Sequence, residues 1–110
     1  MDIFTKAYLE CALWSSIDDN DDPFDKNYSI EDIAPEDVKK MEADCAKFQA
    51  ENHVTSEQAG HDFWLTRQHH GAGFWDGDWP EPQAAQLTEA SHQFKETYLY
   101  VGDDGLIHCD

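Results

Sequence analysis

The segment HDFWLTRQHHGAGFWDGDW, residues 61–79, constrains the fold most strongly, because it gathers large rings around three glycines. Rings of this size are buried or used for recognition, and glycines allow tight reversals and close approach of two backbones. Over residues 62–66 the side chains alternate, with Phe63 and Leu65 on one face, which is typical of a half-buried strand. Residues 68–75 then predict a reversal and a returning strand, so the segment is expected to form a β-hairpin.

The rings of this hairpin are assigned to two faces. We expect Phe63, Leu65 and Phe74 to lie in the core. Trp64 and Trp75 are expected on the opposite face of the sheet, either beneath a helix or in an exposed recognition patch.

Three other segments have helical periodicity. Residues 2–16 carry apolar side chains at close to helical spacing, and residues 34–51 place Pro35 at the first helical position before an apolar stripe. A third stripe follows Pro82 and continues to about residue 96. Between the first two helices, the acidic run IDDNDDPFD predicts a loop, because Asp, Asn and Pro favour turns.

Two short capping signals lie between the longer segments. Ser29 followed by Asp32 predicts the cap of one short turn. Thr55 with Gln58 resembles a capping box, and Gly60 is expected to end the turn that follows it.

The C-terminus predicts a second hairpin. Residues 98–101 and 106–109 alternate on either side of a Gly-Asp-Asp-Gly turn. Because an isolated hairpin is marginal in water, the two hairpins are expected to share one sheet. A chain of 110 residues suits one modest core. The sequence therefore predicts a single α+β domain, residues 1–110, with N-terminal helices packed on a small antiparallel sheet of two β-hairpins separated by a helix.

The charge balance restricts the classes of partner. The chain has 24 Asp and Glu residues against 7 Lys and Arg, a formal net charge of -17 and a pI near 4.3. Such a chain is repelled by phosphate backbones and by anionic membranes, so neither nucleic acid nor membrane is expected as a direct partner. Two interpretations remain open: simple solubility, or a negative surface directed at a basic protein.

The cysteines and the apolar runs predict a cytoplasmic protein. Cys11, Cys45 and Cys109 are widely spaced and form no CxxC pair, which argues against a disulfide framework or a zinc ribbon. No apolar run approaches the length of a membrane span, and the N-terminus lacks the pattern of a signal peptide. We expect reduced thiols.

The histidines show no recognised metal motif. HExxH and HxH spacings are absent, and no cysteine stands beside them in a zinc-binding arrangement. No nucleophile elbow or phosphate-binding glycine loop is present either. We therefore expect no catalytic residue, metal or cofactor, although a metal site would follow if strands brought three histidines together; the candidates are His61, His69, His70, His92 and His108.

A calcium loop is also not expected. Asp18, Asn20 and Asp22 have the spacing that opens an EF-hand loop. Pro23 stands where that loop needs glycine, and Ser29 stands where it needs a bidentate glutamate.

Several motifs together resemble a family of small accessory proteins encoded by tailed bacteriophages. These motifs are YLECALWSS at 8–16, NYSIEDIAPE at 27–36, GHDFWLTR at 60–67, GAGFWD at 71–76 and LYVGDDG at 99–105. The family has no assigned chemistry. The resemblance implies a small protein that binds and blocks a host factor, and an acidic surface that imitates the charge spacing of nucleic acid suits that role.

The expected function is therefore a non-enzymatic inhibitor or modulator of a basic host protein that handles nucleic acid or takes part in defence. Two alternatives stay open: a small metal-dependent enzyme that uses His61, His69 and His70, and an oligomeric or virion-associated structural protein that uses the tryptophans as its interface. The residues expected to bind the partner are Asp18, Asp19, Asp21, Asp22, Asp25, Glu31, Asp32, Glu36, Asp37, Trp64 and Trp75.

Overall fold

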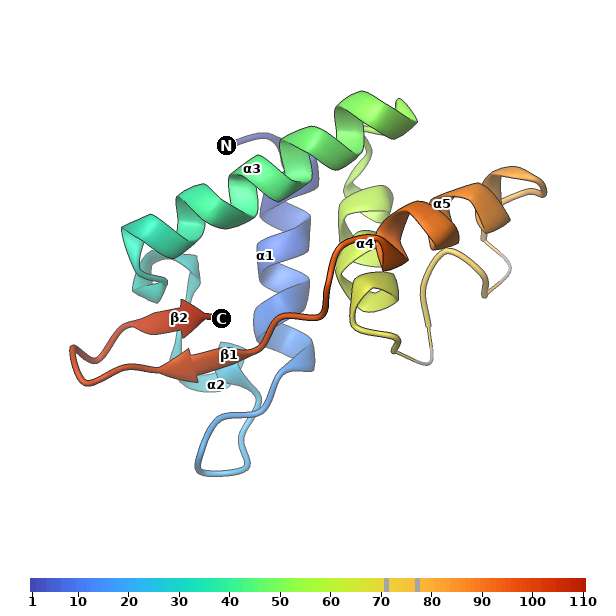
Figure 1. Cartoon of the computed structure of the whole chain (residues 1–110). Coiled ribbons are helices and arrows are strands. Elements are labelled where there is room, and N and C mark those ends of the chain that lie inside the picture. Colours follow the sequence, from blue (N-terminus) through green and yellow to red (C-terminus); the bar gives the residue numbers. More distant parts are fainter. Residues whose placement is uncertain (71, 77) are drawn as a thin grey trace.

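The computed structural model describes residues 1–70, 72–76 and 78–110 (Figure 1). Over these residues it combines five α-helices and one short 3₁₀ helix with a two-stranded antiparallel sheet, which confirms the expected mixture of helix and sheet. In chain order the elements are α1 (Ile3–Ser15), α2 (Phe24–Asn27), η1 (Ile30–Asp32), α3 (Pro35–Asn52), α4 (Glu57–Arg67), α5 (Gln83–His92), β1 (Leu99–Val101) and β2 (Ile107–Cys109).

The core is a cluster of aromatic rings between α1, α3 and α4. Helices α1 and α4 form the most extensive helix pair, α3 crosses α1, and α5 packs against α4 (Figure 1). Phe48 of α3 stacks on Phe63 of α4 with ring centroids 4.1 Å apart. Phe4 and Tyr8 of α1 place their rings 6.1 and 5.2 Å from Phe63. Each such pair adds about 0.5–1.5 kcal/mol beyond the burial of its area.

The helices predicted over residues 2–16 and 34–51 are confirmed within a residue or two. Asp2 caps α1, because its Oδ1 accepts a hydrogen bond of 2.8 Å from the Thr5 amide. Pro35 occupies the first turn of α3, as the sequence predicts. The cap at Ser29 is also present. The Ser29 amide donates a hydrogen bond to Asp32 Oδ2 at 2.8 Å at the start of η1.

The predicted first hairpin is wrong, because residues 62–66 lie in α4. This helix is capped by Ser56, whose Oγ accepts from the Ala59 amide at 3.1 Å, rather than by Thr55. Gly60 does not end the helix; it lies inside, buried against the backbone of Phe4. Phe63, Trp64 and Leu65 are all buried, since α4 is covered on several sides. The two-face alternation assigned to residues 62–66 therefore does not mark a strand.

The predicted returning strand is also absent from the described residues. Residues 72–75 form bends and turns. Residue 71 of the predicted reversal and the glycine at position 77 lie outside the described residues. Gly73 has φ 147°, and a Cβ there would collide with the hydroxyl of Thr66. The expected core positions of Phe63, Leu65 and Phe74 are nevertheless confirmed, because each is at most 2% exposed.

The C-terminal hairpin is confirmed. Strands β1 and β2 pair antiparallel, with Tyr100 opposite His108 and a positive-φ glycine, Gly105, in the turn. A single parallel bridge joins Ile107 to Ile33, and the Ala34 amide donates to the Ile107 carbonyl at 2.8 Å. The hairpin is thereby attached to the segment that leads into α3, and not to a second hairpin as expected.

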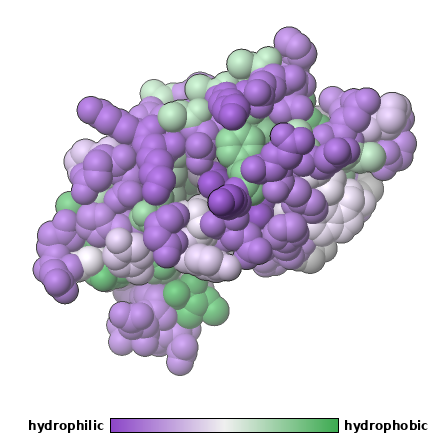
Figure 2. Space-filling model, in the orientation of Figure 1, coloured by the Kyte–Doolittle hydropathy of each residue, from purple (hydrophilic) through white to green (hydrophobic). Residues whose placement is uncertain are grey.

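Figure 2 shows one face on which hydrophilic residues predominate and hydrophobic residues form separate patches. Within the described residues, no helix has both the length and the apolar composition needed to cross a bilayer.

Candidate functional site

Four of the carboxylates expected to bind a partner have roles within the fold. Asp18 is almost fully buried, and its Oδ1 accepts from the amides of Asn20 and Asp22 at 2.9 and 3.1 Å. Asp32 caps η1. The other two are paired with basic side chains: Asp22 lies 3.2 Å from Lys26 Nζ, and the buried Asp37 bonds His108.

The other five predicted carboxylates are exposed. Asp19 and Asp21 lie in the loop before α2, and Asp25 lies on α2 itself. Glu31 belongs to η1, and Glu36 belongs to the first turn of α3. Asp25 and Glu31 are distinguished from the rest because they line cavities.

The larger of these cavities is a cleft of about 610 Å³ between α1, α2 and α4. Three carboxylates, Glu10, Asp25 and Glu57, lie along it. A neighbouring cavity of about 320 Å³ shares Glu10 and Asp25 and extends to Glu31. The two cavities therefore form one continuous surface, called here the acidic cleft; the side chains lining its larger part are Ala7, Glu10, Cys11, Trp14, Asp25, Glu57, Gln58 and His61.

An aromatic pair forms one wall of the acidic cleft. The Trp14 side chain is 55% exposed, and its ring lies 5.9 Å from that of His61 at 34°. His61 Nδ1 is buried and 3.5 Å from Asp62 Oδ1, and within the described part of the chain nothing hydrogen-bonds to it. Asp62 is held by Trp79, whose Nε1 donates to Oδ2 at 2.7 Å. An exposed indole beside carboxylates is a suitable site for an organic cation.

Sequence reasoning missed most of this cleft. The periodicity of residues 2–16 assigned Trp14 to the apolar stripe of the first helix. In the structure Ile3, Ala7, Glu10 and Trp14 lie at helical spacing on the face of α1 opposite the core. The mixed apolar and acidic character of that stripe was the available signal.

The two predicted tryptophans are placed differently from each other. Trp64 is 2% exposed, and its Nε1 donates to Ser15 Oγ at 2.7 Å, so the expectation that it lies on a sheet face is corrected. Trp75 is 44% exposed but lies in a turn instead of a strand.

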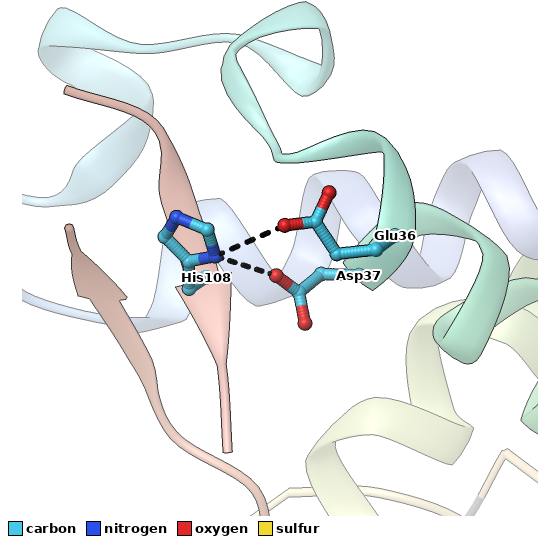
Figure 3. A group of neighbouring side chains, drawn as sticks. All are labelled: Glu36, Asp37 and His108. Atoms are coloured by element: carbon cyan, nitrogen blue, oxygen red, sulfur yellow. Dashed lines mark hydrogen bonds and ion pairs between the residues drawn. The ribbon is translucent and has the colours of Figure 1, made fainter. Parts of the chain in front are cut away.

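A second cluster surrounds His108 on β2. Its Nδ1 lies 2.8 Å from Asp37 Oδ2 and 3.9 Å from Glu36 Oε1, as Figure 3 shows. On the other side, Nε2 lies 3.0 Å from Asp104 Oδ2. The ring of Tyr100 stacks on the imidazole with centroids 5.6 Å apart. Hydrogen bonds to Asp104 and Asp37 raise the pKa of His108.

The histidines of the metal-dependent alternative do not meet. His61 lines the acidic cleft, whereas His70 lines a different cavity near Ser15 and Thr97. His69 stacks on His92 with ring centroids 4.2 Å apart. The predicted hairpin that was to bring His61, His69 and His70 together is absent from the described residues, so that arrangement loses its structural basis.

Comparison with known proteins adds no further constraint. No protein-family model, curated protein or solved structure matches the chain. The resemblance to phage accessory proteins therefore stays a prediction.

Proposed function

We propose that this chain is a phage-encoded, non-enzymatic binding protein that modulates a basic host protein in the host cytoplasm. Its partner is a protein that handles nucleic acid or takes part in defence. The observation that carries the proposal is the acidic cleft, in which Glu10, Asp25 and Glu57 line the same cavity as the exposed ring of Trp14.

The cleft suits a lysine or arginine side chain from the partner. A cation over an indole gains roughly 0.5–2 kcal/mol, depending on how far it is desolvated. The carboxylates that line the same cavity add charge-assisted hydrogen bonds, and arginine can make two of these to one carboxylate. The alkyl stem of either side chain packs on the apolar part of Ala7 and Trp14.

The negative charge of the wider surface supports this role by steering a basic partner toward the protein. A net charge of -17 attracts a basic partner at long range and raises its association rate. Of the expected acids, Asp25 lines the larger cavity and Glu31 its smaller neighbour. Asp19, Asp21 and Glu36 are exposed and contribute to the field without being assigned contacts. The proposed contact centre thus moves from the loop before α2 to the cleft beside it.

A charge-matched comparison tests this function. One variant carries Glu10→Gln, Asp25→Asn and Glu57→Gln in the cleft. Its control carries Glu51→Gln, Glu89→Gln and Asp103→Asn, which neutralises the same number of exposed acids elsewhere. Both are immobilised beside the wild-type protein, and proteins captured from a bacterial lysate are quantified by mass spectrometry over a range of salt concentrations.

We expect a basic nucleic-acid-handling or defence protein to bind the wild type and the control, and to bind the cleft variant at least about tenfold more weakly. Binding should also weaken as salt rises, because charges are screened over about 8 Å at physiological ionic strength. Equal losses in both variants would reduce the effect to net charge and reject the cleft. Salt-insensitive partners alone would reject the proposed function.

A further inference from the structure

We infer that Glu36, Asp37 and His108 bind a divalent first-row transition-metal ion such as Zn²⁺, at a site distinct from the acidic cleft. The three residues each offer one ligand atom, and these atoms lie within 4.8 Å of one another. Figure 3 shows the two carboxylates on the first turn of α3 turned toward the imidazole on β2. This inference does not depend on the proposed function.

The ligand atoms need little movement to enclose an ion. Bonds from zinc to nitrogen or oxygen are about 2.0–2.2 Å, so two ligand atoms of one ion stand roughly 3–4 Å apart. Asp37 Oδ2 and His108 Nδ1 are 2.8 Å apart, and Glu36 Oε1 is 3.9 Å from the same nitrogen. The Asp37 and His108 side chains are mostly buried and held in place, whereas the exposed Glu36 is free to adjust.

The surroundings of the cluster match those of a metal-bound histidine. A histidine that binds a metal through one ring nitrogen usually donates the other N–H to a carboxylate or carbonyl, which fixes the ring and its tautomer. His108 Nε2 lies 3.0 Å from Asp104 Oδ2, which leaves Nδ1 facing Asp37 and Glu36. The Asp37 carboxylate is also supported, since Cys109 Sγ lies 3.5 Å from its second oxygen.

The charge of the cluster favours a divalent cation. Three carboxylates, those of Glu36, Asp37 and Asp104, surround one imidazole. Even with the imidazole protonated, the carboxylates outnumber the positive charge. A divalent ion replaces the proton on Nδ1 and neutralises more of this charge.

The donor set selects the class of metal. One imidazole nitrogen with two carboxylate oxygens suits zinc, iron, cobalt or manganese better than magnesium or calcium, which take oxygen ligands alone. Three protein ligands leave further coordination positions, and water can fill them because the Glu36 side chain is exposed. The ion would also join α3 to β2, and so stabilise the attachment of the C-terminal hairpin.

The experiment uses the full chain freed of metal with a chelator and then titrated with Zn²⁺, Co²⁺ or Mg²⁺. Isothermal calorimetry gives the stoichiometry, thermal unfolding gives the Tm, and the visible absorption of Co²⁺ reports its ligands. We expect one ion per chain and a higher Tm with Zn²⁺ and Co²⁺, because an ion that binds only the folded state stabilises it. Mg²⁺ should have no comparable effect.

Variants identify the ligands. His108→Ala should abolish binding, and Glu36→Gln, at an exposed position that leaves the fold intact, should weaken it at least about tenfold. Asp104→Asn, outside the ligand set, should weaken binding about 10–100-fold. The control is His69→Ala with His92→Ala, which removes the stacked pair of imidazoles and should leave binding unchanged.

Two results would overturn the inference. One is a wild-type protein whose Tm and calorimetry do not respond to Zn²⁺ or Co²⁺. The other is binding that survives in Glu36→Gln and His108→Ala but is lost from the His69 and His92 variant, which would assign the ion to the stacked imidazoles.

Discussion

Gly60 of α4 lies directly against Phe4 of α1, so close that a Cβ on Gly60 would overlap the Phe4 carbonyl oxygen. This contact sets the distance between the two helices that form the most extensive pair in the fold. It also explains why a glycine is present inside a helix, where its conformational freedom costs stability.

Gly60→Ala is therefore expected to destabilise the protein by about 1–3 kcal/mol, because the added methyl group pushes two backbones apart. The sign of the change in unfolding free energy distinguishes a crowded site from an open one. Helix propensity alone favours alanine over glycine by about 1 kcal/mol, so an uncrowded site would gain stability. Urea unfolding measures the difference, and a more stable variant would contradict the close approach.

Replacement by phenylalanine should destabilise the protein at Trp64 but have little effect at Trp14. Trp64→Phe removes the hydrogen bond to Ser15 and leaves a cavity, so we expect a loss of roughly 1–3 kcal/mol. Trp14→Phe should change stability by less than about 0.5 kcal/mol, because that ring is largely exposed. Chemical denaturation of both variants checks this. Similar effects at the two positions would contradict the placement of α4.

The N-cap at Asp2 should give α1 a pH-dependent contribution. Hydrogen bonds from Thr5 lower the pKa of Asp2 below its usual 3.8. Its contribution is therefore complete above the unfolded-state pKa and is lost as the pH falls through the lower folded-state pKa. Asp2→Ala should cost about 1 kcal/mol at neutral pH. The difference in free energy of unfolding between Asp2→Ala and the wild type should become smaller in strong acid.

Asp2→Asn is the matched control, since asparagine caps a helix about as well as aspartate but carries no charge. The difference in free energy of unfolding between Asp2→Asn and Asp2→Ala should stay constant over the same pH range. Unfolding curves at neutral pH and at a pH below the folded-state pKa of Asp2 decide the point. An Asp2→Ala deficit that does not change with pH would show that the carboxylate charge has no part in the cap.

The thiols should be inert in the folded protein. Burial raises the pKa of Cys11 and of Cys45 to about 12, and it also raises the pKa of Cys109. Because the thiolate is the reactive form, a disulfide reagent near neutral pH should modify them at least about 100-fold more slowly than a free thiol. In denaturant all three should react at once. A rapidly reacting thiol in the native protein would show that the helix or strand that carries it opens readily.

Residues 2–16, 34–51 and 98–109 were predictable because their signals are local. The apolar spacing of residues 2–16, a proline at the first turn of α3 and a glycine turn before β2 act over a few residues. The net charge and the burial of Phe63 and Phe74 also follow from composition and hydrophobicity.

Tertiary packing decided the rest. Helix α4 is buried on several faces, so its residues lack the periodicity that marks a helix packed on one side only. Whether Trp14 or Trp64 reaches solvent depends on which helices cover each ring. The larger part of the acidic cleft takes residues from three helices, and 71 positions separate Asp37 from His108. A local pattern specifies the conformation of a segment, whereas a site built from distant segments exists only once packing brings their side chains together.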